Sequence, residues 1–73
     1  MDLLLQRNGQ LFGIERKRMD APRMTRSIRI AQQDLGLTQV VVLYPGSKRY
    51  PIADGVEVVP VSALAAEKNL FCL

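Results

Sequence analysis

The chain has 73 residues, of which 48% are hydrophobic and 23% are charged, and its net charge is +3. A chain of this length and composition folds as one small domain with a modest core, and its mild positive charge permits nucleic-acid contact without demanding it. Cys72 is the only cysteine, so an internal disulfide is excluded, and the absence of histidine excludes histidine chemistry. No apolar run approaches the ~18 residues that a membrane-spanning helix needs. A cytoplasmic location is therefore expected.

The first predicted element is a β-hairpin with strands at about residues 2–7 and 10–16. Asn8 and Gly9 separate two apolar runs, and this dipeptide favours a two-residue type I′ turn, which needs positive φ at both central residues. Counting outward from that turn places Leu5 opposite Phe12, Leu3 opposite Ile14 and Asp2 opposite Glu15.

The two acids at the open end of this hairpin need a compensating charge. Like charges on directly paired residues are destabilising because their Cβ atoms are only about 4.5–5.5 Å apart. A divalent cation is one candidate for the compensation. Lys17 is another, because side chains alternate along a strand and Lys17 therefore shares a face with Glu15.

The other face of the hairpin is apolar, and a second layer is expected to cover it. Its residues are Leu3, Leu5, Phe12 and Ile14. A sheet face of this kind has to be buried against another element.

An amphipathic helix is predicted after a loop at residues 18–23. Thr25 can serve as its N-cap, the residues on its buried side recur at spacings of three and four, and Gly36 suits the position just past its C-terminus. The expected buried stripe is Ile28, Ala31 and Leu35, and the expected exposed face carries Arg26, Arg29 and Gln33.

The remaining elements are shorter. Residues 39–43 are a β-branched run typical of a strand buried on both faces, and 56–59 form a further strand before Pro60. Turns are expected at 44–47 and 54–55, a helix capped by Ser62 over 62–66, and a frayed tail over 67–73. The predicted order is thus β-β-α-β-β-α in one α/β sheet with a helix on one face, and strands 10–16 and 39–43 form a right-handed parallel crossover.

This arrangement resembles the core of PD-(D/E)xK nuclease-like domains, and more narrowly the C-terminal domain of unknown function of a family of AAA-type ATPases. The resemblance covers nearly the whole chain, as a single domain over 1–73. The matching segments are Asp-Leu-Leu-Leu (2–5), Ile-Glu-Arg-Lys (14–17), Pro-Arg-Met-Thr-Arg-Ser (22–27), Asp-Leu-Gly (34–36), Tyr-Pro-Gly (44–46), Tyr-Pro-Ile (50–52), Gly-Val (55–56) and Pro-Val (60–61).

The resemblance implies that Asp2, Glu15 and Lys17 are the catalytic residues. Asp2 and Glu15 would be ligands of a cation such as Mg²⁺, while Lys17 would orient water or steady charge on a phosphate. The alternative is that Glu15 and Lys17 are ordinary polar residues on a solvated strand face.

The chain also departs from the family pattern. Arg16 stands where an apolar residue is usual between the glutamate and the lysine. The helix and strand that precede the aspartate in such nucleases are missing, which makes the domain a truncated one. No Gly-rich phosphate loop is present either, so no ATP site is expected in this chain.

Two kinds of partner follow from these patterns. The strand of Asp2 would be an open sheet edge, and such edges invite a homodimer. Arg26, Arg29, Lys48 and Arg49 are candidate contacts to nucleic-acid phosphates, with the alternative that they lie on a solvated helix face and in a turn. Tyr50 either stacks on a base or anchors a loop onto the sheet.

The leading functional expectation is a nuclease-like domain that is non-catalytic alone and keeps a residual contact site for a divalent cation and nucleic-acid phosphate. The alternative from another class is a small interaction module that dimerises through its exposed strand. A metal-dependent phosphodiesterase is the second alternative, and an active chain would then be a Mg²⁺-dependent nuclease.

Overall fold

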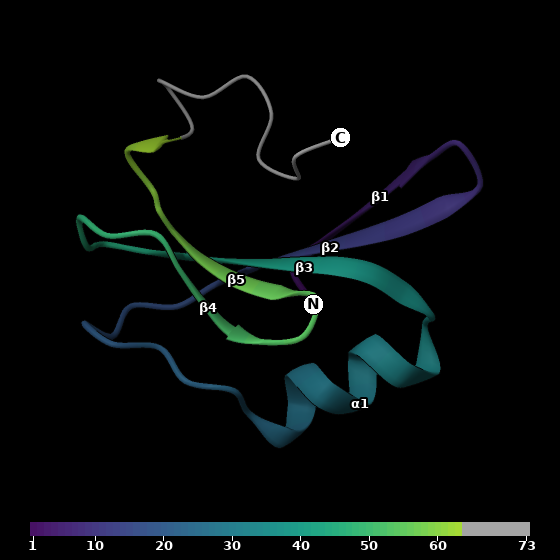
Figure 1. The fold of residues 1–73 in the computed structure, drawn as a ribbon, viewed down its shortest axis with the longest axis horizontal. Coiled ribbons are helices and arrows are strands. Elements are labelled where there is room, and N and C mark those ends of the chain that lie inside the picture. Colours follow the sequence, from purple (N-terminus) through teal and green to yellow (C-terminus); the bar gives the residue numbers. More distant parts are fainter. Residues whose placement is uncertain (64–73) are drawn as a thin grey trace.

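The computed structural model describes residues 1–63, which form a five-stranded sheet and one nine-residue helix (Figure 1). The elements are β1 (Leu3–Arg7), β2 (Gln10–Arg16), α1 (Arg26–Asp34), β3 (Leu37–Tyr44), β4 (Tyr50–Ala53) and β5 (Val56–Pro60). The sheet order is β1-β2-β3-β5-β4, with β3 parallel to both β2 and β5 and antiparallel pairs at the two ends. This arrangement confirms the α/β class, the antiparallel hairpin and the parallel crossover. Within residues 1–63, no helix has the length and apolar character needed to cross a membrane.

The hairpin has the predicted turn and the predicted register. Asn8 and Gly9 both have positive φ, at 53° and 77°, as a type I′ turn requires. Leu5 pairs with Phe12, and the pairing continues without a shift from Arg7 to Leu3. The two-residue turn therefore fixes which residues of β1 and β2 lie side by side.

The helix begins and ends where its caps were predicted, but its buried stripe is narrower. Thr25 is the N-cap, and its hydroxyl accepts a hydrogen bond from the amide of Ile28 at 3.1 Å. Gly36 follows the helix with a φ of 63°. The prediction that Leu35 is buried is wrong, because Leu35 is the C-cap and is 44% exposed. Of the helical residues only Ile28 is buried, and the side chain of Gln32 adds a hydrogen bond of 3.1 Å to the carbonyl of Asp54 in the turn between β4 and β5.

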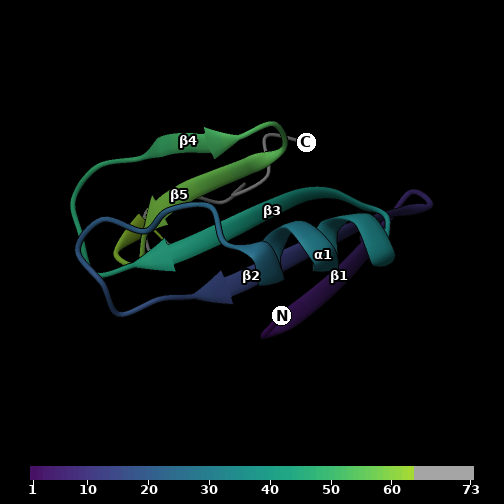
Figure 2. The same cartoon turned by 90° about the horizontal axis from the view of Figure 1, so that it is seen from below.

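Two apolar clusters lie on opposite faces of the central strand β3. One contains Ile28 of α1 together with Val40, Val42 and Tyr44, and the other contains Phe12 with Val41, Leu43 and Val59. The four residues 40–43 are each at most 7% exposed, which confirms the prediction of a strand buried on both faces. In Figure 2, α1 lies in front of β2 and runs alongside β3.

The helix covers the face of the hairpin opposite to the apolar one. Gly13 pairs with Val40 and Glu15 with Val42, and both valines belong to the cluster under α1. On the apolar face Phe12 is 1% exposed, whereas Leu3 and Leu5 are 50% and 41% exposed. The expectation that a second layer covers this whole face is therefore wrong for β1, whose two leucines on this face are exposed.

No strand was predicted at residues 50–53, which form the edge strand β4. It pairs antiparallel with β5 and has a register shift between Pro51 and Ala53. Proline is tolerated there because an edge strand leaves one row of backbone amides without a partner strand. The turn at 54–55 is confirmed by the φ of 73° at Gly55. The helix predicted over 62–66 lies outside the described residues except for its first two positions, and the tail 67–73 lies wholly outside them.

Candidate functional site

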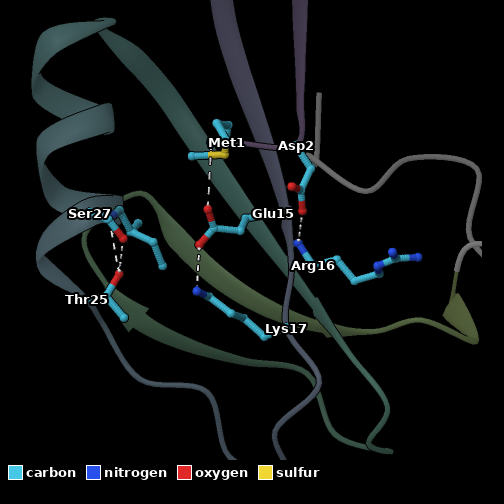
Figure 3. Close-up of polar contacts among 8 residues, drawn as sticks. Met1, Asp2, Glu15, Arg16, Lys17, Thr25 and Ser27 are labelled. Carbon is cyan, nitrogen blue, oxygen red and sulfur yellow. Dashed lines mark hydrogen bonds and ion pairs between the residues drawn. The ribbon is translucent and has the colours of Figure 1, made fainter.

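Glu15 lies near the end of β2, on the face that carries α1, and contacts two amines. Its Oε2 atom is 3.3 Å from Nζ of Lys17, and its Oε1 atom is 3.9 Å from the α-ammonium group of Met1 (Figure 3). The Glu15 side chain is 14% exposed, and that of Lys17 is 31% exposed. Of the two candidates for charge compensation, the structure thus shows Lys17 in contact with the carboxylate.

Asp2 directly precedes β1 and extends the hairpin through one backbone and one side-chain hydrogen bond to β2. Its backbone amide donates to the carbonyl of Ile14 at 3.1 Å, and its Oδ2 atom accepts a hydrogen bond from the amide of Arg16 at 2.7 Å. Figure 3 shows the Asp2 carboxylate turned toward Arg16 and the Glu15 carboxylate turned toward Met1 and Lys17. The structure therefore brings Asp2, Glu15 and Lys17 into one region, with separate partners for the two acids.

The donor set around Glu15 suits a hard divalent cation in one respect. Its Oε2 atom is buried and has no hydrogen-bond partner, although it lies within ion-pair distance of Lys17. Buried polar atoms without a hydrogen bond are uncommon, and a bound cation would give this one a partner. Among residues 1–63 no cluster of three or more His, Cys, Asp or Glu side chains could hold a metal. Asp2 and Glu15 therefore offer at most two carboxylates, the number that Mg²⁺ typically takes beside water and phosphate.

Arg16, the residue that departs from the family pattern, is exposed at the end of β2. In Figure 3 its side chain extends away from Glu15 and Lys17. Because the strand end is uncovered there, the guanidinium group reaches solvent without burial.

The four basic residues singled out from the sequence lie on two separate elements. Arg26 and Arg29 are exposed on α1, and Lys48 is exposed on the loop between β3 and β4. Arg49 differs, because its guanidinium group lies 2.7 Å from Glu57 in an ion pair. That pair lowers the positive charge that Arg49 presents to a phosphate.

An open cleft of about 550 Å³ lies between the loop that precedes α1 and the strands β3 and β4. Tyr44 and Tyr50 line it with their rings at 89° and their centroids 6.0 Å apart. The Tyr50 hydroxyl donates to the carbonyl of Pro22 at 3.1 Å, so this tyrosine does anchor a loop to the sheet. Lys48 also lines the cleft, together with Arg23, which the sequence reasoning missed. Its position in the sequence could have indicated this, because Arg23 lies between Pro22 and the helix cap Thr25, in the loop that leads back to the sheet.

The cleft adjoins the acid–lysine cluster. The amide of Lys17 donates to the carbonyl of Leu43 at 2.8 Å, which fixes Lys17 beside the end of β3. Tyr44, the next residue of β3, is buried and lines the cleft. Lys17 thus lies beside the end of β3, one residue from the cleft residue Tyr44, but does not itself line the cleft.

These features define a mixed α/β domain with an acid–lysine cluster at the carboxyl end of its central strands. The chain belongs to the family described as "Domain of unknown function (DUF4143)", which matches residues 1–64. Uncharacterised proteins of Mycobacterium tuberculosis and Mycobacterium bovis are each 38% identical to it over 64 residues. These matches cover 88% of this chain and 14% of each relative, so the chain spans a small part of the relatives' length. No solved structure matches the chain.

Proposed function

We propose that this chain is a PD-(D/E)xK-like nuclease core that is non-catalytic alone and keeps a contact site for a divalent cation and a nucleic-acid phosphate. Asp2 and Glu15 would hold the cation, and Lys17 would contact the phosphate. The observation that supports this most is the hairpin geometry, in which the amide of Asp2 bonds Ile14 and the neighbouring Glu15 lies 3.3 Å from Lys17.

The charges of the cluster support a weak site. The Glu15 carboxylate contacts two amines, those of Lys17 and Met1, whereas the Asp2 carboxylate accepts a hydrogen bond from the Arg16 amide. A cation that binds Glu15 has to compete with both amines for the carboxylate. A bound Mg²⁺ would supply charge neutralisation at a phosphate oxygen, and Lys17, released from Glu15, would then be available to the same phosphate.

The contacts of Asp2 argue against cleavage by this chain alone. Oδ2 of Asp2 already accepts the hydrogen bond from Arg16 that holds the open end of the hairpin. Drawing the Asp2 carboxylate toward Glu15 would cost that bond. A site whose ligand must leave a structural contact is poorly preorganised for catalysis.

We further propose that the domain acts as part of a longer protein that also carries an AAA-type nucleotide-binding module. The chain covers 14% of the mycobacterial relatives, which leaves ample length for other domains in those proteins. The sequence of this chain has no Gly-rich phosphate loop, so nucleotide binding would belong to that other module.

Titration of the full chain with Mn²⁺ and Mg²⁺ tests the cation site. Mn²⁺ is expected to broaden the amide signals of Glu15 and Arg16 at millimolar concentration, and Glu15→Gln is expected to abolish this effect. Asp34→Asn is a matched control because Asp34 is an exposed acid at the end of α1 that leads into the start of β3, whereas Glu15 pairs near the other end of that strand. Equal broadening in wild type and Glu15→Gln would contradict the proposal.

Binding to short duplex DNA tests the phosphate contact. Lys17→Met is expected to weaken the Mg²⁺-dependent part of the affinity, which is measured as the difference between titrations with and without the cation. Cleavage of the DNA by the wild type, lost in Lys17→Met, would replace the non-catalytic proposal with that of an active metal-dependent phosphodiesterase.

A further inference from the structure

The two edges of the described sheet differ in how well they are protected. At one edge, β4 has only four residues, contains Pro51 and shows a register shift against β5. Short length, proline and irregular register are the usual devices that keep an edge from pairing with another chain. At the other edge, β1 has five residues, contains no proline and pairs with β2 without a shift.

The unprotected edge is also the most apolar exposed segment of the sheet. All five residues of β1 are exposed, and they include three consecutive leucines. Leu3, Leu4 and Leu5 are 50%, 43% and 41% exposed, respectively. Leucine side chains at these positions gain little from β1 and β2 alone, and a further strand beside β1 would bury them.

The tight turn determines which backbone groups of β1 point outward. Residues that flank a two-residue loop exchange both hydrogen bonds, and this pattern recurs at every second residue. Arg7, Leu5 and Leu3 therefore direct their amides and carbonyls toward β2. Leu4 and Gln6 direct theirs away from the sheet, where they can pair with a new strand.

We propose that β1 pairs antiparallel with β1 of a second copy of this chain, with Leu4 on the two-fold axis. In this register Leu4 pairs with Leu4 of the second copy, and Leu3 pairs with Leu5 twice. The outward amides and carbonyls of the two Leu4 residues supply the central pair of hydrogen bonds, while Gln6 lies opposite Asp2 of the second copy, whose amide stays bonded to Ile14. The pairing joins two five-stranded sheets into one continuous sheet, and the contact is isologous because the same segment serves both copies.

The sequence of β1 favours a second copy over an unrelated strand. The three leucines are symmetric about Leu4, so reversal of the strand reproduces the apolar pattern. The exposed Asp2 and Arg7 stand at opposite ends of the segment, and antiparallel pairing brings the acidic end of one copy beside the basic end of the other. A register centred on Leu5 would instead place Leu4 opposite Gln6 and Leu3 opposite Arg7, which loses the leucine pairs.

The oligomeric state of the full chain is the first test. Sedimentation equilibrium over a concentration series is expected to show a monomer–dimer equilibrium. Leu4→Lys is expected to raise the dimer dissociation constant by about tenfold or more, because it sets two like charges opposite each other at the axis. Ile30→Lys is the matched control, since Ile30 is 43% exposed on α1 and lies outside the contact. A monomer at all concentrations, or equal weakening by both variants, would overturn the proposal.

Disulfide cross-linking tests the register. In a Cys72→Ser background, Leu4→Cys is expected to form a disulfide-linked dimer under mild oxidation, because paired Cα atoms about 5.5 Å apart are within disulfide range. Leu5→Cys is expected to cross-link far less, since Leu5 faces Leu3 of the second copy. Preferential cross-linking through Leu5→Cys, or a dimer that neither variant cross-links, would overturn the proposed pairing. Circular dichroism confirms that each variant is folded before it is compared.

Discussion

The backbone amide of Arg16 donates a hydrogen bond of 2.7 Å to the Asp2 carboxylate, which takes the place of a backbone carbonyl at the open end of the hairpin. Asp2 also uses its own amide to bond the carbonyl of Ile14. Asp2 thus provides hydrogen-bond partners for both the carbonyl of Ile14 and the amide of Arg16 in β2. This gives Asp2 a structural role that any proposed role in cation binding has to share.

Loss of the Asp2 carboxylate is predicted to open this end of the hairpin. Asp2→Ala removes the acceptor for the Arg16 amide, and we expect the exchange of that amide with solvent to accelerate and stability to fall by about 1 kcal/mol. Hydrogen exchange followed by NMR measures the first effect, and urea denaturation measures the second.

Asp2→Asn is the matched variant because its side-chain carbonyl can still accept the bond. It is expected to keep most of the protection of Arg16 while removing the charge. If Asp2→Ala leaves the Arg16 amide as protected as in the wild type, the side chain does not hold this strand end.

Neutralising Glu15 is predicted to destabilise the chain. If Asp2 and Glu15 faced each other without partners, neutralising Glu15 would relieve their repulsion and stabilise the chain. In the structure, however, Glu15 forms ion pairs with the amines of Lys17 and Met1. Glu15→Gln therefore removes attraction, and we expect a loss of about 0.5–1 kcal/mol, the range of partly exposed ion pairs. Urea denaturation at low salt measures this change, which should shrink at high salt because ions screen the pair.

A gain in stability for Glu15→Gln would mean that repulsion from Asp2 outweighs both ion pairs. Glu57→Gln is the comparison variant, since Glu57 forms the 2.7 Å pair with Arg49 on the other side of the sheet centre. Its salt dependence should be similar, but it should leave the hairpin amides unchanged.

The parts of the fold that local chemistry determines could be predicted from the sequence. The positive φ values at Asn8 and Gly9 follow from the residue types, and the register of β1 and β2 follows from that turn. The cap Thr25 and the glycine after α1 are similarly local signals. The proximity of Asp2, Glu15 and Lys17 was accessible for the same reason, because counting from a two-residue turn needs no tertiary information.

What depends on distant partners could not be predicted. Pro51 argues against a strand by any local rule, and only the presence of β5 beside it makes β4 an edge strand. Strand alternation shows which hairpin residues share a face, but it does not show which face α1 covers. The contact of Glu15 with the amine of Met1 depends on how the chain end folds back, for which the sequence carries no pattern.

Gly46 is predicted to be intolerant of a side chain because it lies against the Tyr44 ring. A Cβ at this position would lie 2.1 Å from Cε2 of Tyr44. The ring has little room to move, since Tyr44 is 3% exposed and its hydroxyl accepts a hydrogen bond from the amide of Lys48 at 3.0 Å. Gly46→Ala should cost roughly 2–3 kcal/mol in urea denaturation, as overpacked sites do.

A double-mutant cycle separates this clash from a backbone effect. In a Tyr44→Ala background the space next to Gly46 is empty, so Gly46→Ala should cost much less there. An equal cost in both backgrounds would assign the effect to the backbone of the turn.

The hairpin turn should respond to the handedness of residue 9 and not to its size. Gly9 has a φ of 77° and nothing within 4 Å of an added Cβ. Gly9→Ala is therefore expected to cost about 1–2 kcal/mol through the left-handed backbone conformation alone. A chemically synthesised chain with D-alanine at position 9 should be at least as stable as the wild type, because a D-residue favours positive φ.

Thermal unfolding of the L-alanine and D-alanine chains measures the difference. Equal destabilisation by both enantiomers would show that the turn has another conformation in solution. Since the positions of Asp2 and Glu15 are counted from this turn, that outcome would also remove the basis for placing the two acids together.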